Sequence, residues 1–300
     1  MNNKKTAGVI YAVCAYTLWG ILPIYWKLIN SVFSIEILSN RIVWAFVFTI
    51  VIIAVTKQWD ELKGIAKDRK QMAYIFIAAI LITINWGLYI WTVNSDKIVD
   101  ASLGFYINPL LAVALGVLIF KEKLSYFAGA GLIIASIGVI IKTVQYGKIP
   151  WISLGLAISF GLYGAIKKSV KASSIVGLTL ETAMITPVAA AYLVSRQFNG
   201  VSAFQMEGPL VILLLIGAGV VTAVPLLLFA SGARRLPLSL IGFTQYISPT
   251  ISLLIGIFVY HEGFTTVDLI AFCFIWAALA IYSFSQMSLA KSPKNLEQIG

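Results

Sequence analysis

Long, continuous apolar segments joined by short links are the feature that most constrains this chain. A helix needs about 20 mainly apolar residues to cross the hydrocarbon core of a bilayer. Ten segments approach this length: 7–28, 35–56, 72–94, 101–120, 126–143, 151–168, 175–195, 210–231, 239–260 and 266–287. Their continuous rather than alternating character indicates helices and not strands. The sequence therefore predicts an all-α, polytopic membrane protein with ten transmembrane helices.

Composition excludes several other classes of protein. Charged residues make up 11% of the 300 residues, and hydrophobic residues make up 60%. Soluble domains carry about 25% charged residues, so a soluble enzyme and a disordered chain are both excluded. Cys14 and Cys273 lie within apolar segments, which argues against a disulfide and against a metal site. The sequence contains no phosphate loop and no zinc motif, and it predicts no cofactor.

Lysine and arginine are distributed unequally between the two faces. If the N-terminus is inside, 16 of the 22 fall on inner segments and 6 on outer segments, with the densest group in the polar link 57–71. The positive-inside rule then predicts that both termini are cytoplasmic, in a multi-pass protein of the bacterial inner membrane. The net charge of +10 is read as this topology signal, and no nucleic-acid partner is predicted.

The two halves of the chain are related by a shift of 140 residues. This shift places Pro109 on Pro249 and Glu122 on Glu262. Both glutamates follow a helix end, and we expect them to stabilise those turns. Each half has five helices, so the second half enters the membrane in the opposite orientation, as in many secondary transporters. The predicted units are a first repeat at 7–143, a second repeat at 151–287 and a disordered cytoplasmic tail at 288–300.

Four strings carry a resemblance to a known family. They are LSNRIVW at 38–44, NWGLYIW at 85–91, ASLGFYINPL at 101–110, and the segment 221–250. The chain resembles RarD-type members of the EamA family, in the drug/metabolite transporter superfamily, over nearly its whole length. The resemblance implies a permease of ten helices in two inverted repeats, with a cavity lined by helices 1–4 and 6–9. It implies no substrate, because family members move amino acids, other metabolites or drugs.

Three ionisable residues stand out inside the predicted spans, where a charge at the centre costs at least about 2.5–3.5 kcal/mol. They are Glu36, Arg41 and Glu181. Glu36 and Asn40 share a helical face, whereas Arg41 is turned away from Glu36 and is expected to point into the bundle. We expect Arg41 to bind an anionic group and Glu181 to bind a cation or a proton, and Glu181 is the candidate for proton coupling. The alternative for all three charged residues is a structural ion pair or polar network.

Two prolines and several aromatic residues lie deep in the predicted spans. Proline frees the carbonyl four residues earlier, so Pro109 and Pro249 are predicted to kink helices around a cavity, the alternative being kinks that serve packing only. Deep aromatic residues suit either an amphipathic ligand or core packing. Trp26, at a helix end, is read as an interfacial residue. The remaining predicted binding residues are Trp19, Trp44, Asn85, Trp86, Tyr89, Asn108, Gln245 and Tyr246.

The sequence as a whole predicts a secondary transporter that exports a small polar or amphipathic metabolite or drug by alternating access. The expected partners are the small-molecule substrate, the lipid bilayer and protons. Monomer and homodimer both stay open. The alternative is a non-transporting membrane protein, either an assembly partner or an intramembrane enzyme. The lack of a nucleophile–base pair argues against an enzyme, and the repeat with its buried charges argues against an assembly partner.

Overall fold

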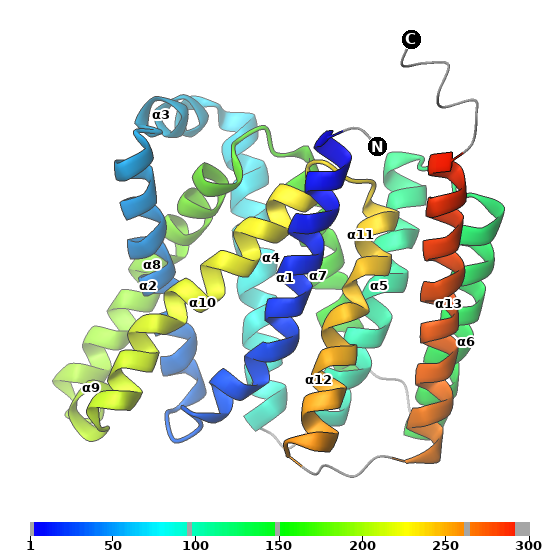
Figure 1. Cartoon of the computed structure of the whole chain (residues 1–300). Coiled ribbons are helices and arrows are strands. Elements are labelled where there is room, and N and C mark those ends of the chain that lie inside the picture. The colour runs from blue at the N-terminus through cyan, green and yellow to red at the C-terminus, as the bar shows by residue number, and fades with distance from the viewer. Residues whose placement is uncertain (1–2, 95–97, 148–150, 261–264, 292–300) are drawn as a thin grey trace.

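The computed structural model describes residues 3–94, 98–147, 151–260 and 265–291. Within these ranges the chain is helical, with no strand (Figure 1). Each of the ten predicted spans overlaps a helix, and the ninth corresponds to the pair α11–α12. The helices are α1 Asn3–Lys27, α2 Ser34–Thr56, α3 Trp59–Lys67, α4 Arg69–Asn94, α5 Ile98–Phe120, α6 Tyr126–Tyr146, α7 Trp151–Ser169, α8 Ser174–Phe198, α9 Ala203–Met206, α10 Pro209–Ala233, α11 Leu238–Gln245, α12 Ile247–Phe258 and α13 Thr266–Lys291.

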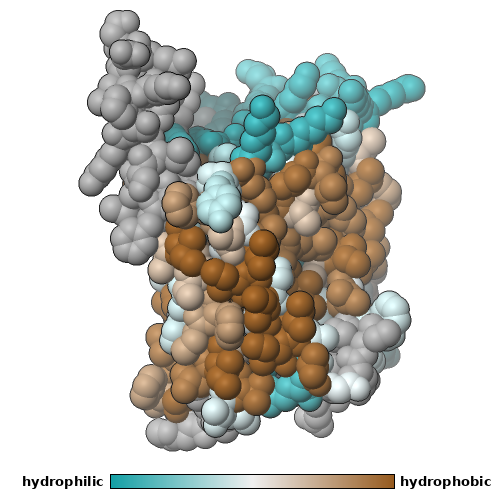
Figure 2. Space-filling model, turned by 90° about the vertical axis from the view of Figure 1, so that its right-hand side faces the viewer, coloured by the Kyte–Doolittle hydropathy of each residue, from teal (hydrophilic) through white to brown (hydrophobic). Residues whose placement is uncertain are grey.

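Seven helical segments of the described chain are long and apolar enough to cross a membrane. They are Lys5–Lys27, Ser34–Thr56, Arg69–Tyr89, Tyr126–Gln145, Ser174–Met206, Pro209–Ala233 and Leu238–Phe258. Gly104–Phe120 and Thr266–Tyr282 are shorter apolar helices. Figure 2 shows a broad apolar surface, with hydrophilic residues gathered at the end that carries α3 in Figure 1. The chain is therefore a multi-pass membrane protein.

The helices form three groups from one side of the bundle to the other (Figure 1). α2, α8 and α10 pack together on one side, and α6 packs on α13 at the other. Between them lie α1, α4, α5, α7, α11 and α12. α6 and α13 correspond to the fifth and tenth predicted spans, and their peripheral position agrees with the resemblance, which implies a cavity lined by the other eight helices.

Close helix contacts depend on small residues at two crossings. A Cβ atom at Gly219 of α10 would overlap the carbonyl carbon of Trp44 in α2. A Cβ atom at Gly138 of α6 would lie 2.8 Å from the carbonyl oxygen of Ala271 in α13. Both crossings need glycine because backbone atoms occupy the space that a side chain would take.

The start of α1 and the end of α13, the first and last described residues, lie at the same end of the bundle, which we call the terminal end (Figure 1). α13 continues to Lys291, so the helix extends into the segment 288–300 that was predicted to be a disordered tail. Residues 292–300, and the turn that contains Glu262, lie outside the described residues.

Candidate functional site

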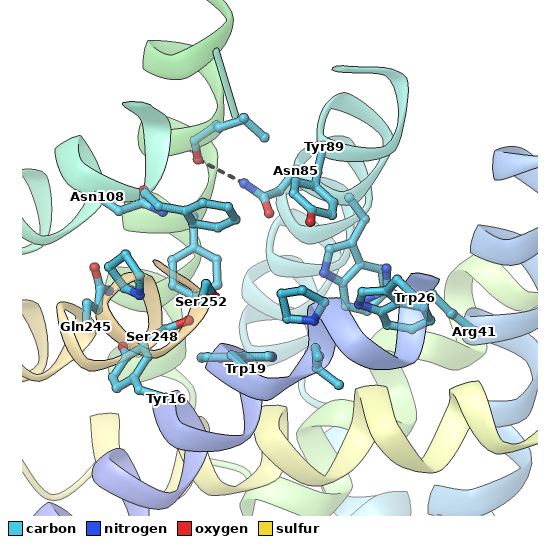
Figure 3. Close-up of a pocket in the computed structure, with 17 residues that line it drawn as sticks. Tyr16, Trp19, Trp26, Arg41, Asn85, Tyr89, Asn108, Gln245, Ser248 and Ser252 are labelled. Atoms are coloured by element: carbon cyan, nitrogen blue, oxygen red, sulfur yellow. Dashed lines mark hydrogen bonds between the residues drawn. The ribbon is translucent and has the colours of Figure 1, made fainter. Parts of the chain in front are cut away.

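A cavity of about 150 Å³ opens between helices of both halves of the chain. α1, α2, α4 and α5 of the first half and α7, α11 and α12 of the second half contribute to its wall. Its residues lie in the half of α1 that is remote from the N-terminus, from Tyr16 to Trp26, and in the neighbouring parts of the other helices. The predicted residues that line the cavity are Trp19, Arg41, Asn85, Trp86, Tyr89, Asn108, Gln245 and Pro249 (Figure 3).

Arg41 supplies the positive charge of this cavity. It is only 7% exposed, and its guanidinium carbon lies 4.4 Å from the Trp26 ring centre and 4.9 Å from that of Trp86. Its Nε donates a hydrogen bond to Thr222 Oγ1 on α10 at 3.0 Å. Within the described residues, no carboxylate forms an ion pair with Arg41. Two indole rings thus stabilise a buried cation whose terminal nitrogens stay available to a ligand.

Three side-chain amides face the same cavity. Asn85 is held in place, because its Nδ2 donates to the Leu156 carbonyl and to Ser159 Oγ of α7, both at 2.9 Å. Asn108 and Gln245 are different, since their side-chain oxygens are buried and accept no hydrogen bond from a described residue. Buried polar groups are rarely left unpaired. These two amides are therefore groups whose hydrogen bonding a ligand can complete.

Aromatic rings close the cavity on the side toward the N-terminal end of α1. We call these five residues the aromatic floor. Trp19 lies 5.4 Å from Tyr16, 5.7 Å from Phe160 and 5.7 Å from Phe229, measured between ring centres. Tyr163 stacks on Phe229 at 6.1 Å. The floor lies on the side of the cavity toward the start of α1, because Tyr16 and Trp19 are the lining residues nearest that end of the helix. Its members are Tyr16, Trp19, Phe160, Tyr163 and Phe229.

Comparison with known proteins identifies the family. Residues 6–144 match the model of the EamA-like transporter family. The Bacillus subtilis protein named uncharacterized transporter YojE is 48% identical over 301 residues, which cover 98% of this chain and 100% of that protein. Protein RarD of Escherichia coli K12 is 40% identical over 283 residues, which cover 94% and 96% of the two chains. The chain belongs to the EamA-like transporter family. It is a RarD-type member, so the resemblance seen in the sequence is confirmed and the protein is a membrane transporter.

A solved crystal structure shares the fold of this EamA transporter. The TM-score is 0.71 at 14% sequence identity, and the match covers 92% of this chain and 97% of the other. The likeness concerns the arrangement of helices alone. The family relationship rests on the two sequence relatives.

Glu36 lies in a polar network away from the cavity of the transporter. Its side chain is buried, and it accepts hydrogen bonds from the Ala203 backbone N–H at 2.6 Å and from Ser202 Oγ at 3.3 Å. It also forms an ion pair with Arg196 at 3.2 Å. Asn40 Nδ2 donates to the Glu36 carbonyl at 3.0 Å, as the shared helical face predicts. The structure thus places Glu36 where it ties α2 to α8 and α9.

Glu181 is also separate from the main cavity. Lys167 Nζ donates to its carboxylate at 2.6 Å, and Tyr163 Oη donates at 3.2 Å. Lys167 is one of the 16 basic residues that the sequence assigns to the inner side, and in the structure it is only 3% exposed. Tyr163 and Lys167 lie four residues apart on one face of α7. This spacing was the sequence signal that both could contact the same buried acid.

A small second void lies beside Glu181 and shares one lining residue, Trp86, with the main cavity. It has a volume of about 10 Å³, and it is lined by residues of α2, α4 and α8 that include Trp86 and Glu181. Trp86 also lines the main cavity, so its indole ring is the partition between the two spaces.

The other predicted residues outside the cavity lie at helix crossings. The backbone of Trp44 contacts α10 at Gly219, and the carbonyl of Pro109 lies 2.7 Å from the position of a Cβ at Gly242. Tyr246 packs in a cluster with Tyr106 and α13 residues. α11 ends at Gln245 and α12 begins at Ile247, so the predicted ninth span is broken at Tyr246, close to Pro249.

Glu122 joins the two halves of the chain at the terminal end of the bundle. Its carboxylate accepts hydrogen bonds from the backbone N–H groups of Leu238 and Ser239 at the start of α11, and it pairs with Lys168 of α7 at 2.5 Å. Partial burial opposes ionisation, but Lys168 and the donors of Ser239 and Leu238 outweigh it and hold the pKa of Glu122 below its usual value. The predicted local role in a turn beside Lys121 is therefore corrected to a contact between halves, which we call the Glu122 contact.

Sequence reasoning missed nine residues of the cavity wall. Four of them lie on α1 and continue the face of Trp19 at spacings of three and four residues, a helical stripe that the sequence did contain. Trp26 was assigned to the membrane interface, but it lies against Arg41. The missed residues are Tyr16, Leu22, Pro23, Trp26, Phe105, Leu156, Phe160, Ser248 and Ser252.

Proposed function

We propose that this transporter is a secondary transporter that exports a small polar or amphipathic metabolite or drug by alternating access. The observation that carries the proposal is the cavity, which is built from both halves and has buried polar side chains in its wall. In the proposed orientation both termini are cytoplasmic and the protein lies in the bacterial inner membrane. Protons are the proposed coupling ion, with Glu181 as their carrier.

The pattern of helix contacts supports two inverted repeats, at 7–143 and 151–287. Counting α11–α12 as one span gives ten spans, and the proposed repeat relates each span to the one five places later. This operation exchanges the α1–α10 contact with α7–α4, and the α1–α12 contact with α7–α5. It maps the contacts α2–α8, α5–α11 and α6–α13 onto themselves. A pseudo-two-fold axis in the membrane plane produces such a pattern.

The closure of one side supports an outward-facing state. The aromatic floor and the Glu122 contact lie between the cavity and the proposed cytoplasmic face. Alternating access requires that contacts between the halves at this face break while the cavity closes on the outer side. Because its pKa is lowered, the Glu122 carboxylate stabilises the closed inner face at neutral pH, and this stabilisation is lost as the pH falls through its pKa.

A labelling experiment tests both the orientation and the role of the Glu122 contact. With Cys14 and Cys273 replaced by serine, Ser252→Cys places one thiol in the cavity wall. A membrane-impermeant maleimide added to intact cells is expected to label it. Glu122→Gln removes a charged acceptor, a loss of about 1.5–3 kcal/mol that shifts the protein toward the inward-facing state. The labelling rate is then expected to fall at least about twofold.

Lys123→Gln is the matched control, because it changes an exposed charge next to Glu122 and is expected to leave labelling unchanged. Labelling of Ser252→Cys from the cytoplasmic side alone contradicts the proposed orientation. An unchanged labelling rate in Glu122→Gln removes this residue from the inner gate.

Metabolite profiles test the export function itself. A strain that overproduces the transporter is expected to release a small polar or amphipathic compound into the medium, and a deletion strain to retain it in the cell. Mass spectrometry of medium and cell extract measures both. Identical profiles from the two strains, with the protein present in the membrane of the overproducer, contradict export.

A further inference from the structure

The charge of the cavity wall is not balanced. Among the described residues that line it, Arg41 is cationic and none is acidic. The acids that form ion pairs in the described chain are engaged elsewhere: Glu36 with Arg196, Glu122 with Lys168, Glu181 with Lys167, and Asp268 with Lys142. A ligand in this cavity therefore meets one uncompensated positive charge at low dielectric constant, which favours an anion.

The geometry of Arg41 suits a carboxylate. Thr222 occupies its Nε, and the rings of Trp26 and Trp86 pack against the guanidinium. The terminal nitrogens have no hydrogen-bond partner among the described residues. A guanidinium that keeps its terminal N–H groups free can bind a carboxylate through two parallel hydrogen bonds.

A second polar group lies at the other side of the cavity. Figure 3 shows Asn108 and Gln245 across the cavity from Arg41. Both are more than nine-tenths buried, at 8% and 6% exposure, and their side-chain oxygens have no described partner. An amide both donates and accepts hydrogen bonds without carrying a charge. The matching ligand group is a neutral one, such as a hydroxyl or an amide.

Apolar side chains line the space between these two ends. Trp19, Phe105 and Phe160 contribute rings, and Pro23 and Pro249 contribute further apolar surface. A cavity of about 150 Å³ accommodates a body of roughly the size of benzene. A compact ring or a short branched chain fits this part of the wall.

We propose that the substrate class of this cavity is the organic monoanion that carries a carboxylate at one end, a compact apolar body and a neutral hydrogen-bonding group at the other end. This inference rests on the proposed transport function and specifies its substrate. Cations are disfavoured because Arg41 repels them and no lining acid compensates them. An amino-acid zwitterion is disfavoured because no acidic residue lines the cavity to balance its ammonium group, which Arg41 repels.

A matched set of small aromatic probes tests this class by calorimetric titration of the purified transporter at pH 7. The probe 4-hydroxybenzoate has both end groups, benzoate lacks the hydroxyl, and 4-hydroxybenzyl alcohol lacks the charge. Tyramine is the cationic probe and tyrosine the zwitterionic one. We expect 4-hydroxybenzoate to bind best, with benzoate and 4-hydroxybenzyl alcohol each about tenfold weaker. Tyramine and tyrosine are expected to bind still more weakly.

Two variants assign the ends of the ligand. Arg41→Gln is expected to remove the advantage of 4-hydroxybenzoate over 4-hydroxybenzyl alcohol while the neutral probe still binds. Gln245→Leu is expected to reduce the advantage of 4-hydroxybenzoate over benzoate while benzoate binding is kept. Retained binding of one probe in each variant shows that the protein is folded.

The proposal is overturned if tyramine or tyrosine binds as tightly as 4-hydroxybenzoate, if no probe binds, or if Arg41→Gln leaves the ratio of charged to neutral probe unchanged. Transport is measured separately, by exchange of radiolabelled 4-hydroxybenzoate in proteoliposomes. Selective binding without any exchange contradicts the transport function and leaves the ligand class standing. Exchange of tyramine in preference to the anion contradicts the ligand class and leaves transport standing.

Discussion

Arg41→Leu is expected to abolish transport while the protein still reaches the membrane. The substitution removes the one cationic group of the described cavity wall. Truncating one partner of a desolvated charge pair costs about 2–5 kcal/mol, so transport of an anionic substrate is expected to fall by about 30-fold or more. Export of the compound identified by metabolite profiling measures the loss.

The fold is expected to survive this change. Arg41 forms no ion pair with a described carboxylate, so its removal leaves no uncompensated acid behind. The lost contact is the hydrogen bond to Thr222, which is itself on a buried helix crossing. Leucine also suits the neighbouring indole rings of Trp26 and Trp86.

Lys27→Leu is the matched control. Lys27 ends the same α1 helix as Trp26 and contacts the ring of Tyr260 at 3.7 Å, outside the residues that line the cavity. Its loss removes one positive charge from the same end of the bundle and is expected to leave transport within about twofold. Full transport by Arg41→Leu removes Arg41 from the site, and loss of transport in both variants indicates a general electrostatic effect.

The positions of the helices along the chain could be predicted from the sequence, but which helices pack against one another could not. Each predicted span overlaps a helix because runs of apolar residues report their depth in a membrane directly. α3 was missed within the polar link 57–71, although Trp59, Leu62 and Ile65 give it an apolar side. This helix is too short to span, so the length criterion does not apply to it.

The candidate site could be predicted only in part. Eight of the predicted residues line the cavity, and six lie elsewhere. Depth along the membrane normal does not say which helix faces which. Glu36 and Arg41 lie five residues apart near the same end of α2, yet Glu36 contacts α9 and Arg41 contacts α1 and α4.

The unpartnered side-chain oxygens of Asn108 and Gln245 could not be predicted from the sequence. Both residues were chosen because they lie near kinking prolines. That their oxygens are buried without a described partner depends on how α5, α11 and α1 meet. Such contacts arise from packing between segments more than 100 residues apart, which no local pattern records.

Glu181 is the second residue with a large expected effect. Its carboxylate forms an ion pair with Lys167 and accepts a hydrogen bond from the hydroxyl of Tyr163, and both residues lie on α7. On the α2 and α4 sides, the second void presents Ile42, Ala79, Ile82, Thr83 and Trp86, none of which changes charge near neutral pH. Any proton that Glu181 takes up is therefore exchanged within this pair or with water that enters the void.

The second void lies next to the main cavity, and both are lined by Trp86. A volume of about 10 Å³ is close to the lower limit for one water molecule. The Trp86 ring separates this void from the cavity and also contacts Arg41. We propose that a ligand that moves Trp86 as it binds Arg41 changes the access of water to Glu181 and so links substrate binding to protonation.

Glu181→Gln is expected to abolish accumulation driven by a proton gradient in membrane vesicles, while substrate exchange without a gradient continues within about twofold. Glutamine keeps the shape and the hydrogen bond to Tyr163, but it cannot ionise. Because the change leaves Lys167 buried without its partner, the double variant Glu181→Gln, Lys167→Gln serves as the matched control for stability. Both variants are expected to lose coupling, and the double variant to regain any lost expression. Proton-driven accumulation that persists unchanged in Glu181→Gln excludes this residue as the carrier, and a wild-type protein that never responds to a proton gradient contradicts proton coupling itself.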